Sequence, residues 1–446
     1  MVPWFGGLRI LKTVEAGQPE RPPKGANGAE GSAHRTIAMK RRQESWGKTP
    51  WRISFRARSR TLPEEVEVAI VGGGFTGLAA AAMVKRLARE KSVLLLEAGR
   101  VGNGASGRTG GLVLAETAAG DLPGLGDVLR GYQRILGELG VKAGLRLPGV
   151  WELARGTTSM DGKPVHAIKG SPIEWNDSGR LEAVRSVPGG SVDPGKVVTG
   201  LARAAEKAGA QIREHSRVEK IEFAEPVRLH VARLRPAGVE RRVVDAKQVL
   251  VATNAGSLEL GGDLFLGREP AEPKLTFAMA TAPLSNKQIA DLGLGSGRAF
   301  YTVDLPYLWG RLLRNGAIVW GSGLVPGWGE SARAGTAAQG PGRELWSGLE
   351  RVNTRKGQAA ERLRSLEERV RGLHPVLRKM RVTHRWSGPI LITHDFLPVF
   401  RKHPRSERVI VSGGYSGHGV ALSVYLGERA ARVMAGLETG EWELRH

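Results

Sequence analysis

Two kinds of hydrophobic pattern alternate along the chain. The first is a short apolar strand followed by a helix of small or periodically apolar residues. Residues 66–71 and 92–96 are mainly apolar, and the small residues at 79–82 between them predict a helix. A further strand at 409–411 precedes a periodic helix at 420–435. These segments predict an α/β part of the fold with parallel strands.

The second pattern is that of antiparallel strands. Residues 151–155 and 277–281 have the composition of strands, and residues 306–323 predict a hairpin. The pair Asn315 and Gly316 in the hairpin favours a type I′ turn. A charged, helix-periodic stretch at 342–372 predicts one or two surface helices. The chain therefore combines an α/β part with a mainly antiparallel one.

A glycine motif follows the first strand of the α/β part. Gly72, Gly74 and Gly77 satisfy G-x-G-x-x-G where the strand ends and the helix begins. The first glycine permits the turn, the second admits a pyrophosphate at the helix N-terminus, and the third lets helix and strand pack closely. Glu97 ends the next strand, where a carboxylate accepts hydrogen bonds from ribose hydroxyls and repels a 2′-phosphate. The motif predicts a dinucleotide other than NADP.

Glycine is enriched throughout the chain, with 62 in 446 residues, about twice the usual share. A cluster of them lies at 102–111, GNGASGRTGG. This segment resembles the ASGRNGG-like segment that runs along the flavin in the D-amino-acid oxidase (DAO) superfamily of FAD-dependent oxidoreductases. The resemblance is strongest to its branch of glycine and D-amino-acid oxidases and γ-glutamylputrescine oxidase. Thr109 stands where that branch usually has asparagine.

Four further segments extend the resemblance, in the expected order. Residues 211–221 resemble the strand whose backbone near Val218 holds the adenine. Residues 248–256 resemble the strand end beside the nucleotide. Residues 382–400 resemble the W-x-G…T-x-D-x-x-P segment that leads back to the flavin, and residues 409–423 resemble the C-terminal flavin loop.

The resemblance implies an α/β fold with an α+β second domain. The first domain would be a Rossmann-like FAD-binding domain, and the second a substrate-binding domain with a mostly antiparallel sheet. The implied FAD-binding domain is discontinuous, at 61–140, 193–262 and 375–440, and the substrate-binding domain occupies 141–192 and 263–374.

The resemblance also implies the residues that contact FAD. The glycine-dense turn before the last helix would face the flavin edge where negative charge accumulates on reduction. Because the chain has no cysteine, a cysteinyl link is excluded and FAD is expected to be non-covalent. The implied contacts are Gly72, Gly74, Phe75, Thr76, Gly77, Glu97, Ala98, Ala105, Ser106, Gly107, Arg108, Thr109, Gly110, Gly111, Val218, Ala252, Thr253, Asn254, Gly414, Tyr415, Ser416, Gly417, His418, Gly419 and Val420.

Candidate catalytic residues come mainly from the predicted hairpin. By the resemblance, Arg311 lies in a strand that roofs the substrate cavity and residues 321–323 lie in a glycine turn. Arg311 either clamps a substrate carboxylate or makes a structural ion pair. Nearby aromatic rings either form a cage for an amine or are sheet core. These rings are Tyr301, Tyr307, Trp309 and Trp320, and the candidate catalytic residues are Arg311, Trp309 and His418, the last with loop packing as its alternative role.

The implied activity is oxidation of a C–N bond in an amine or amino acid by hydride transfer to flavin. The imine would hydrolyse to a carbonyl compound and ammonia or an amine, and O₂ or an external acceptor would take up the electrons. Two alternatives stay open. One is a flavoprotein acting on tRNA or another nucleic acid, suggested by the net charge of +22. The other is a flavin-binding partner subunit without turnover of its own.

The basic excess is concentrated at the N-terminus. Residues 1–60 hold 13 of the 66 Lys and Arg residues but only 4 of the 44 Asp and Glu residues. Residues 13–38 are rich in Gly, Pro and Ala without periodicity, which is typical of disorder. Residues 1–60 are therefore expected to form a basic, disordered extension, with Met39 as an alternative start. Its charges are weak support for a nucleic-acid partner, and none is expected.

The composition of the chain excludes several kinds of site and of protein. Without cysteine there is no disulfide, Cys nucleophile, thiolate–zinc site or Cys-ligated cluster. The ten histidines show no metal-ligand spacing, so no metal site is expected. No apolar run is long enough for a membrane span, and no signal peptide is recognisable. These features predict a cytoplasmic enzyme.

Overall fold

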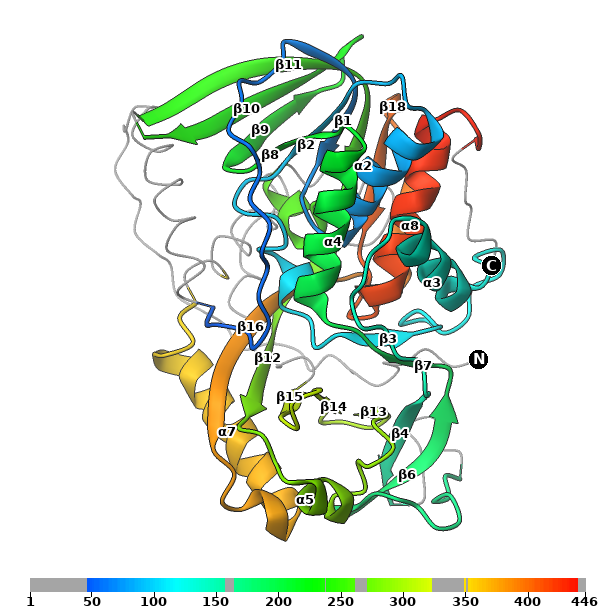
Figure 1. The fold of residues 1–446 in the computed structure, drawn as a ribbon, viewed down its shortest axis with the longest axis vertical. Helices are drawn as coiled ribbons and strands as arrows, with labels where there is room; N and C mark the ends of the chain where they lie inside the picture. Colours follow the sequence, from blue (N-terminus) through cyan, green and yellow to red (C-terminus); the bar gives the residue numbers. More distant parts are fainter. Residues whose placement is uncertain are drawn as a thin grey trace, which may run out of the picture.

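The structure is a computed structural model that describes residues 46–156, 164–236, 238–260, 271–322, 349 and 352–439. The described chain forms two halves, each built on an eight-stranded sheet (Figure 1). A small two-stranded sheet, β3 (Leu112–Leu114) with β7 (Gly189–Ser191), lies where the halves meet.

The first sheet has the order β17-β18-β11-β1-β2-β8, with β10 and β9 extending from β11. Strands β18, β11, β1, β2 and β8 are parallel, and β10 and β17 pair antiparallel with their neighbours. The predicted parallel strand–helix–strand unit is confirmed. The strands are β1 (Glu65–Val71), β2 (Val93–Leu96), β8 (Gln211–Arg213), β9 (Ser216–Glu222), β10 (Val227–Arg235), β11 (Gly238–Val251), β17 (Val399–His403) and β18 (Ser406–Gly413).

Helices cover one face of this sheet. They are α2 (Phe75–Leu87), α3 (Val128–Glu138), α4 (Pro194–Lys207) and α8 (Gly419–Met434) (Figure 1). The fully buried alanines at 79–82 let α4 and α8 approach α2 closely. At Gly427 of α8, a Cβ atom would lie 2.5 Å from the carbonyl oxygen of Thr76. Small residues thus set the spacing of the helical layer.

The second sheet has the order β16-β12-β15-β14-β13-β4-β6-β5 and is mainly antiparallel, as expected. Its strands are β4 (Val150–Arg155), β5 (Glu174–Asn176), β6 (Arg180–Val187), β12 (Glu272–Thr281), β13 (Ala299–Thr302), β14 (Leu308–Leu312), β15 (Ile318–Ser322) and β16 (Val382–Ile392). Helices α5 (Asn286–Asp291) and α7 (Gly357–Leu373) pack with it, and α7 buries Leu366 and Val370 in its core. Residues 342–348 of the predicted helical stretch lie outside the described residues.

The hairpin β14–β15 departs from its predicted turn. Leu313 donates its N–H to Ala317 O at 2.7 Å, and Gly316 N–H donates to Leu313 O at 3.0 Å. Of Asn315 and Gly316, only Gly316 has a positive φ, +82°. A type I′ turn needs positive φ at both, so the loop is a three-residue connection with glycine in the left-handed position. The predicted type I′ turn is therefore wrong.

The predicted glycine turn at 321–323 is also wrong for the residues described. Gly321 and Ser322 belong to β15, opposite Trp309 and Leu308 of β14. A Cβ atom on Gly321 would lie 2.0 Å from the Trp309 ring, so glycine is needed to seat that ring. Gly323 lies outside the described residues.

Two expected boundaries differ from the structure. Trp46 and Phe55 are only 2% and 3% exposed, so residues 46–60 belong to the folded part and not to an extension. Residues 1–45 lie outside the described residues. Strand β16 pairs with β12 in the second sheet, although its motif led us to expect it in the FAD-binding domain. None of the helices in the described ranges is both long and apolar enough to cross a membrane.

Candidate functional site

One long cavity connects the two halves of the molecule. It begins at the carboxyl ends of β1, β2 and β11, where Val71, Leu96 and Ala252 line it. Ligands of open parallel sheets bind at that edge. The cavity continues to the inner face of the second sheet, where Tyr301 and Trp309 line it. Both halves therefore contribute to one site.

The glycine motif shapes the first end of the cavity. Gly72 has φ +112°, and a Cβ atom there would lie 2.6 Å from Ala252 O. A Cβ atom on Gly77 would lie 2.0 Å from Gly72 O, so α2 can pack against β1 only with glycine at 77. Gly74 is the N-cap of α2 and supplies no side-chain cap. The positive end of α2 thus faces the cavity, as a pyrophosphate requires.

Glu97 is held at the end of β2 by two backbone groups. Its carboxylate accepts hydrogen bonds from Gly73 N at 2.8 Å and Gly99 N at 2.7 Å. The side chain lines the cavity. These contacts orient the carboxylate where a ribose would lie. Farther along, Val218 of β9 also lines the cavity, at the position predicted for the adenine.

The 105–111 segment forms the next part of the wall. Ser106 Oγ accepts a hydrogen bond from Phe75 N at 2.9 Å, which joins the segment to the start of α2. Arg108 lines the cavity, and its guanidinium donates to Gly47 O at 3.0 Å. Burial lowers the pKa of Arg108 to about 10, so it stays charged at neutral pH. The segment therefore brings one buried cation to the wall.

The loop before α8 closes this end of the cavity. Gly414, at φ +66°, donates its N–H to Asn254 Oδ1 at 2.9 Å. The hydroxyl groups of Tyr415 and Thr76 lie 2.7 Å apart and are hydrogen-bonded. Ser416 N donates to Leu391 O at 3.1 Å. The loop is thus tied to α2, to β16 and to the segment after β11.

His418 is the N-cap residue of α8 and lines the cavity. Burial lowers its pKa to about 4, because the charged form is poorly solvated there. The imidazole is therefore neutral at pH 7. Positive potential at this wall comes from the N-terminus of α8.

Three aromatic side chains form the far wall of the cavity. Tyr301, Tyr307 and Trp309 line it. Trp309 packs face-on over glycine, since a Cβ atom on Gly110 would lie 2.1 Å from its ring. Trp320 does not belong to this wall: it is fully buried in the core of the second sheet, 5.1 Å from Phe300. Of the four aromatic candidates, Trp320 is therefore core.

Arg311 is not placed at the cavity surface. Its side chain is 6% exposed, and its Nε donates to Gly110 O. The guanidinium also lies 5.9 Å from the centre of the Trp51 ring. On β14 it shares a face with Trp309, but its Nε binds the 105–111 backbone and its side chain does not line the cavity. The geometry gives no support to a carboxylate clamp at Arg311.

Tyr301 connects the cavity to two carboxylates. Its hydroxyl donates to Glu152 Oε1 at 2.6 Å and lies 3.2 Å from Glu116 Oε1. Arg185 holds Glu152 through two bonds of 2.6 and 2.8 Å. Burial and the nearby Glu152 charge raise the pKa of Glu116. This wall of the cavity is therefore backed by negative charge.

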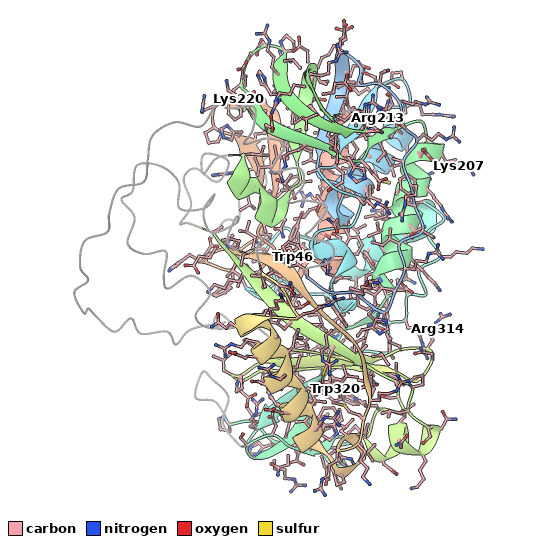
Figure 2. The ribbon with its side chains drawn as sticks, turned by 90° about the vertical axis from the view of Figure 1, so that its left-hand side faces the viewer. Trp46, Lys207, Arg213, Lys220, Arg314 and Trp320 are labelled. Atoms are coloured by element: carbon pink, nitrogen blue, oxygen red, sulfur yellow. The ribbon has the colours of Figure 1, made fainter. Side chains whose placement is uncertain are left out.

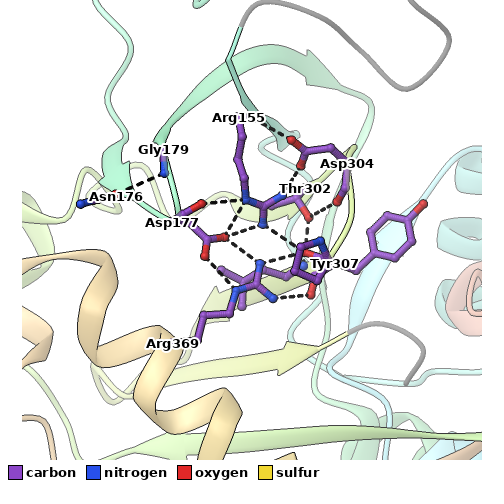
Figure 3. Close-up of polar contacts among 10 residues, drawn as sticks. Arg155, Asn176, Asp177, Gly179, Thr302, Asp304, Tyr307 and Arg369 are labelled. Atoms are coloured by element: carbon purple, nitrogen blue, oxygen red, sulfur yellow. Dashed lines mark hydrogen bonds and ion pairs between the residues drawn. The ribbon is translucent and has the colours of Figure 1, made fainter. Parts of the chain in front are cut away.

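Tyr307 is positioned by an ion cluster on the opposite side of its backbone (Figure 3). Arg369 of α7 donates to Asp177 at 2.7 and 2.9 Å and to Tyr307 O at 3.0 Å. Arg155 of β4 binds Asp177, Asp304 Oδ1 at 2.5 Å and Pro306 O at 3.0 Å. Figure 3 shows the Tyr307 ring pointing away from this cluster. Its backbone is thus fixed while its ring remains at the cavity.

The structure brings most of the predicted FAD contacts together. All line the cavity except four glycines that have structural positions around it. These are Gly77, Gly107, Gly111 and Gly414. Of the candidate catalytic residues, Trp309 and His418 line the cavity and Arg311 does not.

Sequence reasoning missed several lining residues. Gly73 was overlooked although it stands inside the glycine motif, and its N–H holds Glu97. Trp46 lines the cavity, although the sequence had led us to expect a disordered extension over residues 1–60. Residues 388–392 of β16 also line it, which the motif at 382–400 had suggested. Ser423 of α8 lines it with a buried hydroxyl that has no partner among the described residues, and the sequence had marked only the whole segment 409–423.

The residues present fit FAD. A Cβ atom at any of residues 72–74 would lie 3.0 Å or less from a neighbouring atom, the start of α2 lacks a side-chain cap, and the Glu97 carboxylate is fixed by backbone N–H groups. The orphan hydroxyl of Ser423 and the N-terminus of α8 offer donors farther along. Backbone groups line the first end of the cavity and aromatic rings line its far wall. This order suits a dinucleotide followed by a substrate.

Two curated proteins are similar to this chain over most of its length. The 24% identical γ-glutamylputrescine oxidoreductase of Escherichia coli (strain K12) aligns over 416 residues, 84% of this chain and 85% of that protein. Glycine oxidase of Bacillus licheniformis is 23% identical and aligns over 84% of this chain and 94% of its own.

Solved structures share the fold. Glycine oxidase from Geobacillus kaustophilus has a TM-score of 0.60 at 20% identity, covering 84% of this chain and 96% of its own. L-proline dehydrogenase from P. horikoshii has a TM-score of 0.62 at 18% identity, covering 86% and 96%.

The family model described as FAD dependent oxidoreductase (DAO) matches residues 67–433. That range includes the glycine motif, the 105–111 segment and the loop before α8. FAD is accordingly the cofactor, and the protein is an oxidoreductase. The chain belongs to the DAO family of FAD-dependent oxidoreductases.

Proposed function

We propose that this protein oxidises a C–N bond of a small amine or amino acid. The carbon next to nitrogen gives up a hydride and the nitrogen a proton, which leaves an imine. Water then converts the imine into a carbonyl compound and ammonia or a smaller amine. When bound, FAD would supply the two-electron acceptor for the hydride.

The continuity of the cavity carries this proposal. Its first end is made of glycine backbone and Glu97, which suit a dinucleotide, and its far wall is made of Tyr301, Tyr307 and Trp309. A substrate bound against these rings would lie beyond the dinucleotide in the same cavity. A relative that covers most of this chain is named γ-glutamylputrescine oxidoreductase and another glycine oxidase, which supports a nitrogen-containing substrate.

The chain's own groups have separable roles in this proposal. The aromatic rings exclude water from the reacting carbon and can face a cationic or neutral amine. The α8 N-terminus would stabilise negative charge that develops at the flavin edge. His418, with its pKa near 4, would act only as a neutral hydrogen-bonding group at pH 7.

The test is a panel of primary, secondary and polyfunctional amines and of amino acids of both hands. Each is added anaerobically to the FAD-loaded protein, and visible flavin absorbance is followed. We expect at least one compound to bleach the flavin and to yield one carbonyl product per flavin reduced. Hydrazone trapping of that product checks the stoichiometry. A loaded protein that no compound of the panel reduces would contradict the proposal.

Reoxidation is tested separately. We propose O₂ or an external acceptor as the electron recipient. Substrate-reduced protein exposed to O₂ would either recover its absorbance with formation of peroxide or remain reduced until an artificial acceptor is added. The first result identifies an oxidase and the second a dehydrogenase.

A further inference from the structure

Three side chains from distant elements donate to the carbonyl groups of the 105–111 segment. Trp51 Nε1 donates to Gly107 O at 2.7 Å, and Trp386 Nε1 of β16 donates to Arg108 O at 2.9 Å. Arg311 Nε of β14 donates to Gly110 O. The segment is thus held from the N-terminal region and from two strands of the second sheet.

The three donors also contact one another. The rings of Trp51 and Trp386 meet edge to face, with centroids 5.4 Å apart. The Arg311 guanidinium lies 5.9 Å from the centre of the Trp51 ring. None of the three lines the cavity, whereas residues 105, 106 and 108–110 do. Trp51, Trp386 and Arg311 therefore act on the side of the segment that faces away from the cavity.

Residues 46–51 also form hydrogen bonds with the 105–111 segment and with β16. Arg108 Nη1 donates to Trp46 O at 3.3 Å and to Gly47 O at 3.0 Å. On the other side, Ser387 N of β16 donates to Trp46 O at 2.8 Å, and Trp46 Nε1 donates to Leu349 O at 3.0 Å. Figure 2 shows Trp46 at the level between the two halves of the molecule. The N-terminal segment is thus hydrogen-bonded to both the 105–111 segment and β16.

The fit is also tight sterically. A Cβ atom on Gly107 would lie 2.2 Å from Gly102 O and 2.8 Å from Ile53 Cδ1. A segment so rich in glycine has high conformational entropy when free, and fixing it requires contacts outside its own backbone. The three donors supply such contacts at the carbonyl groups of residues 107, 108 and 110.

We propose that Trp51, Trp386 and Arg311 are positioning residues for the cofactor. By fixing the 105–111 backbone they preorganise the wall along which the flavin binds, and residues 46–51 are thereby part of the cofactor site. Preorganised walls raise affinity because less ordering remains to be done on binding. This inference rests on FAD dependence and not on the substrate, so it stands or falls independently of the proposed C–N oxidation.

The test replaces each indole by a phenyl ring, which keeps an aromatic ring and removes the N–H. Trp51→Phe and Trp386→Phe are compared with matched controls in which the indole N–H has no partner among the described residues. Trp151→Phe matches the partly buried Trp51, and Trp320→Phe matches the buried Trp386. For each apoprotein, the dissociation constant of FAD is measured by quenching of flavin fluorescence.

Each test substitution should raise the FAD dissociation constant by roughly three- to tenfold, the effect of one lost hydrogen bond. The controls should change it by less than about twofold. The visible circular dichroism of the bound flavin should change in the test variants and not in the controls, because the wall itself is displaced. Urea unfolding of the four apoproteins measures any general loss of stability.

A purely structural role would give a different result. Trp51→Phe and Trp386→Phe would then lose stability relative to the controls, with unchanged FAD affinity and flavin dichroism, and the proposal would be overturned. If Trp386→Phe does not fold, Trp51→Phe decides, since Trp51 is only partly buried. Unchanged FAD affinity in a folded Trp51→Phe protein would overturn the role of the N-terminal segment.

Discussion

The two ends of the cavity are built in different ways. At the dinucleotide end, the backbone forms the surface, and Gly72 and Gly77 are required because a Cβ atom at either would lie 2.6 Å or less from a backbone carbonyl oxygen. At the substrate end, side chains form the surface, and contacts behind them hold those side chains. Tyr307 is held by Arg369 and Asp177, which do not line the cavity themselves.

This difference separates binding of the cofactor from binding of the substrate. A change at the first end should affect folding and FAD together, because the same backbone serves both. A change behind the second end should leave FAD in place and alter only the aromatic wall. The two ends can therefore be disturbed one at a time.

Gly77→Ala should have the largest effect. Its Cβ atom would lie 2.0 Å from Gly72 O, so α2 must move away from β1 and the cradle opens. We expect a loss of about 3 kcal/mol in unfolding free energy, typical of strong overpacking, and no retained FAD. Urea unfolding and the flavin content of the purified protein measure both. Gly137→Ala in α3 is the control, since no atom lies within 4 Å of its added Cβ and Gly137 does not line the cavity; equal losses in the two variants would contradict the steric argument.

Asp177→Asn should have the next largest effect. It leaves Arg155 and Arg369 without their shared carboxylate in a cluster that is largely buried. We expect a loss of about 2 kcal/mol, less than for a fully buried pair, with a higher KM and an unchanged FAD dissociation constant. Asp291→Asn, in an exposed pair with Lys287, should cost less than about 0.5 kcal/mol. A loss of FAD from Asp177→Asn would show that the two ends are not separable.

The contribution of the Asp177 carboxylate to stability should depend on pH. Burial raises the pKa of Asp177, but hydrogen bonds from Arg369 and Arg155 more than offset it, and the net pKa is below the ordinary value. Its contribution is therefore present above the pKa of an unfolded Asp and is lost as the pH falls through the folded value. The difference in unfolding free energy between the wild type and Asp177→Asn should shrink in acid. A difference that is constant down to the acid limit would exclude this role.

Tyr301→Phe should have a smaller effect. It removes the donor to Glu152 and leaves both carboxylates behind the wall without that phenol. We expect a loss of about 1 kcal/mol in stability and a changed preference among charged and neutral amines, with FAD affinity unchanged. Competition between two amines for flavin reduction measures the preference. An unaltered preference would mean that the negative charge behind this wall is not sensed in the cavity.

A last effect concerns the dependence of stability on pH at His418. Its folded pKa is about 4, below the ordinary value of 6.5, so only the unfolded chain binds the proton between these values. Stability should thus fall as the pH is lowered from 6.5 to 4. His418→Gln should lack this component. Thermal unfolding of both proteins across this pH range checks the sign, and a parallel pH dependence in the two would contradict it.

The dinucleotide half was predictable from the sequence because its backbone geometry allows only certain residue types at certain positions. Gly72 needs a positive φ and Gly77 must lie against a carbonyl oxygen, so the sequence has only one choice at each. The parallel strands follow in the same way, since strands buried on both faces are apolar without interruption. Most predicted FAD contacts therefore line the cavity.

The substrate half was less predictable because its side chains are positioned by contacts between residues that lie far apart in the chain. The pattern placed Arg311 correctly on the face of Trp309, but not the carbonyl of Gly110 that it binds. Trp320 and Tyr301 are both aromatic strand residues, and only the sheet order shows that one faces the core and the other the cavity. Trp46 was assigned to an extension because its neighbours in the sequence are mostly charged. Its burial depends on β16, which lies far away in the chain.

The most direct measurement is an anaerobic substrate titration of the wild type and of Asp177→Asn, both loaded with FAD. We predict that an amine or amino acid bleaches the visible absorbance of the wild type, and that Asp177→Asn needs more of it while holding the same amount of FAD. Full flavin occupancy in the wild type with no bleaching by any such compound would contradict the central claim that one cavity joins the cofactor to a C–N substrate.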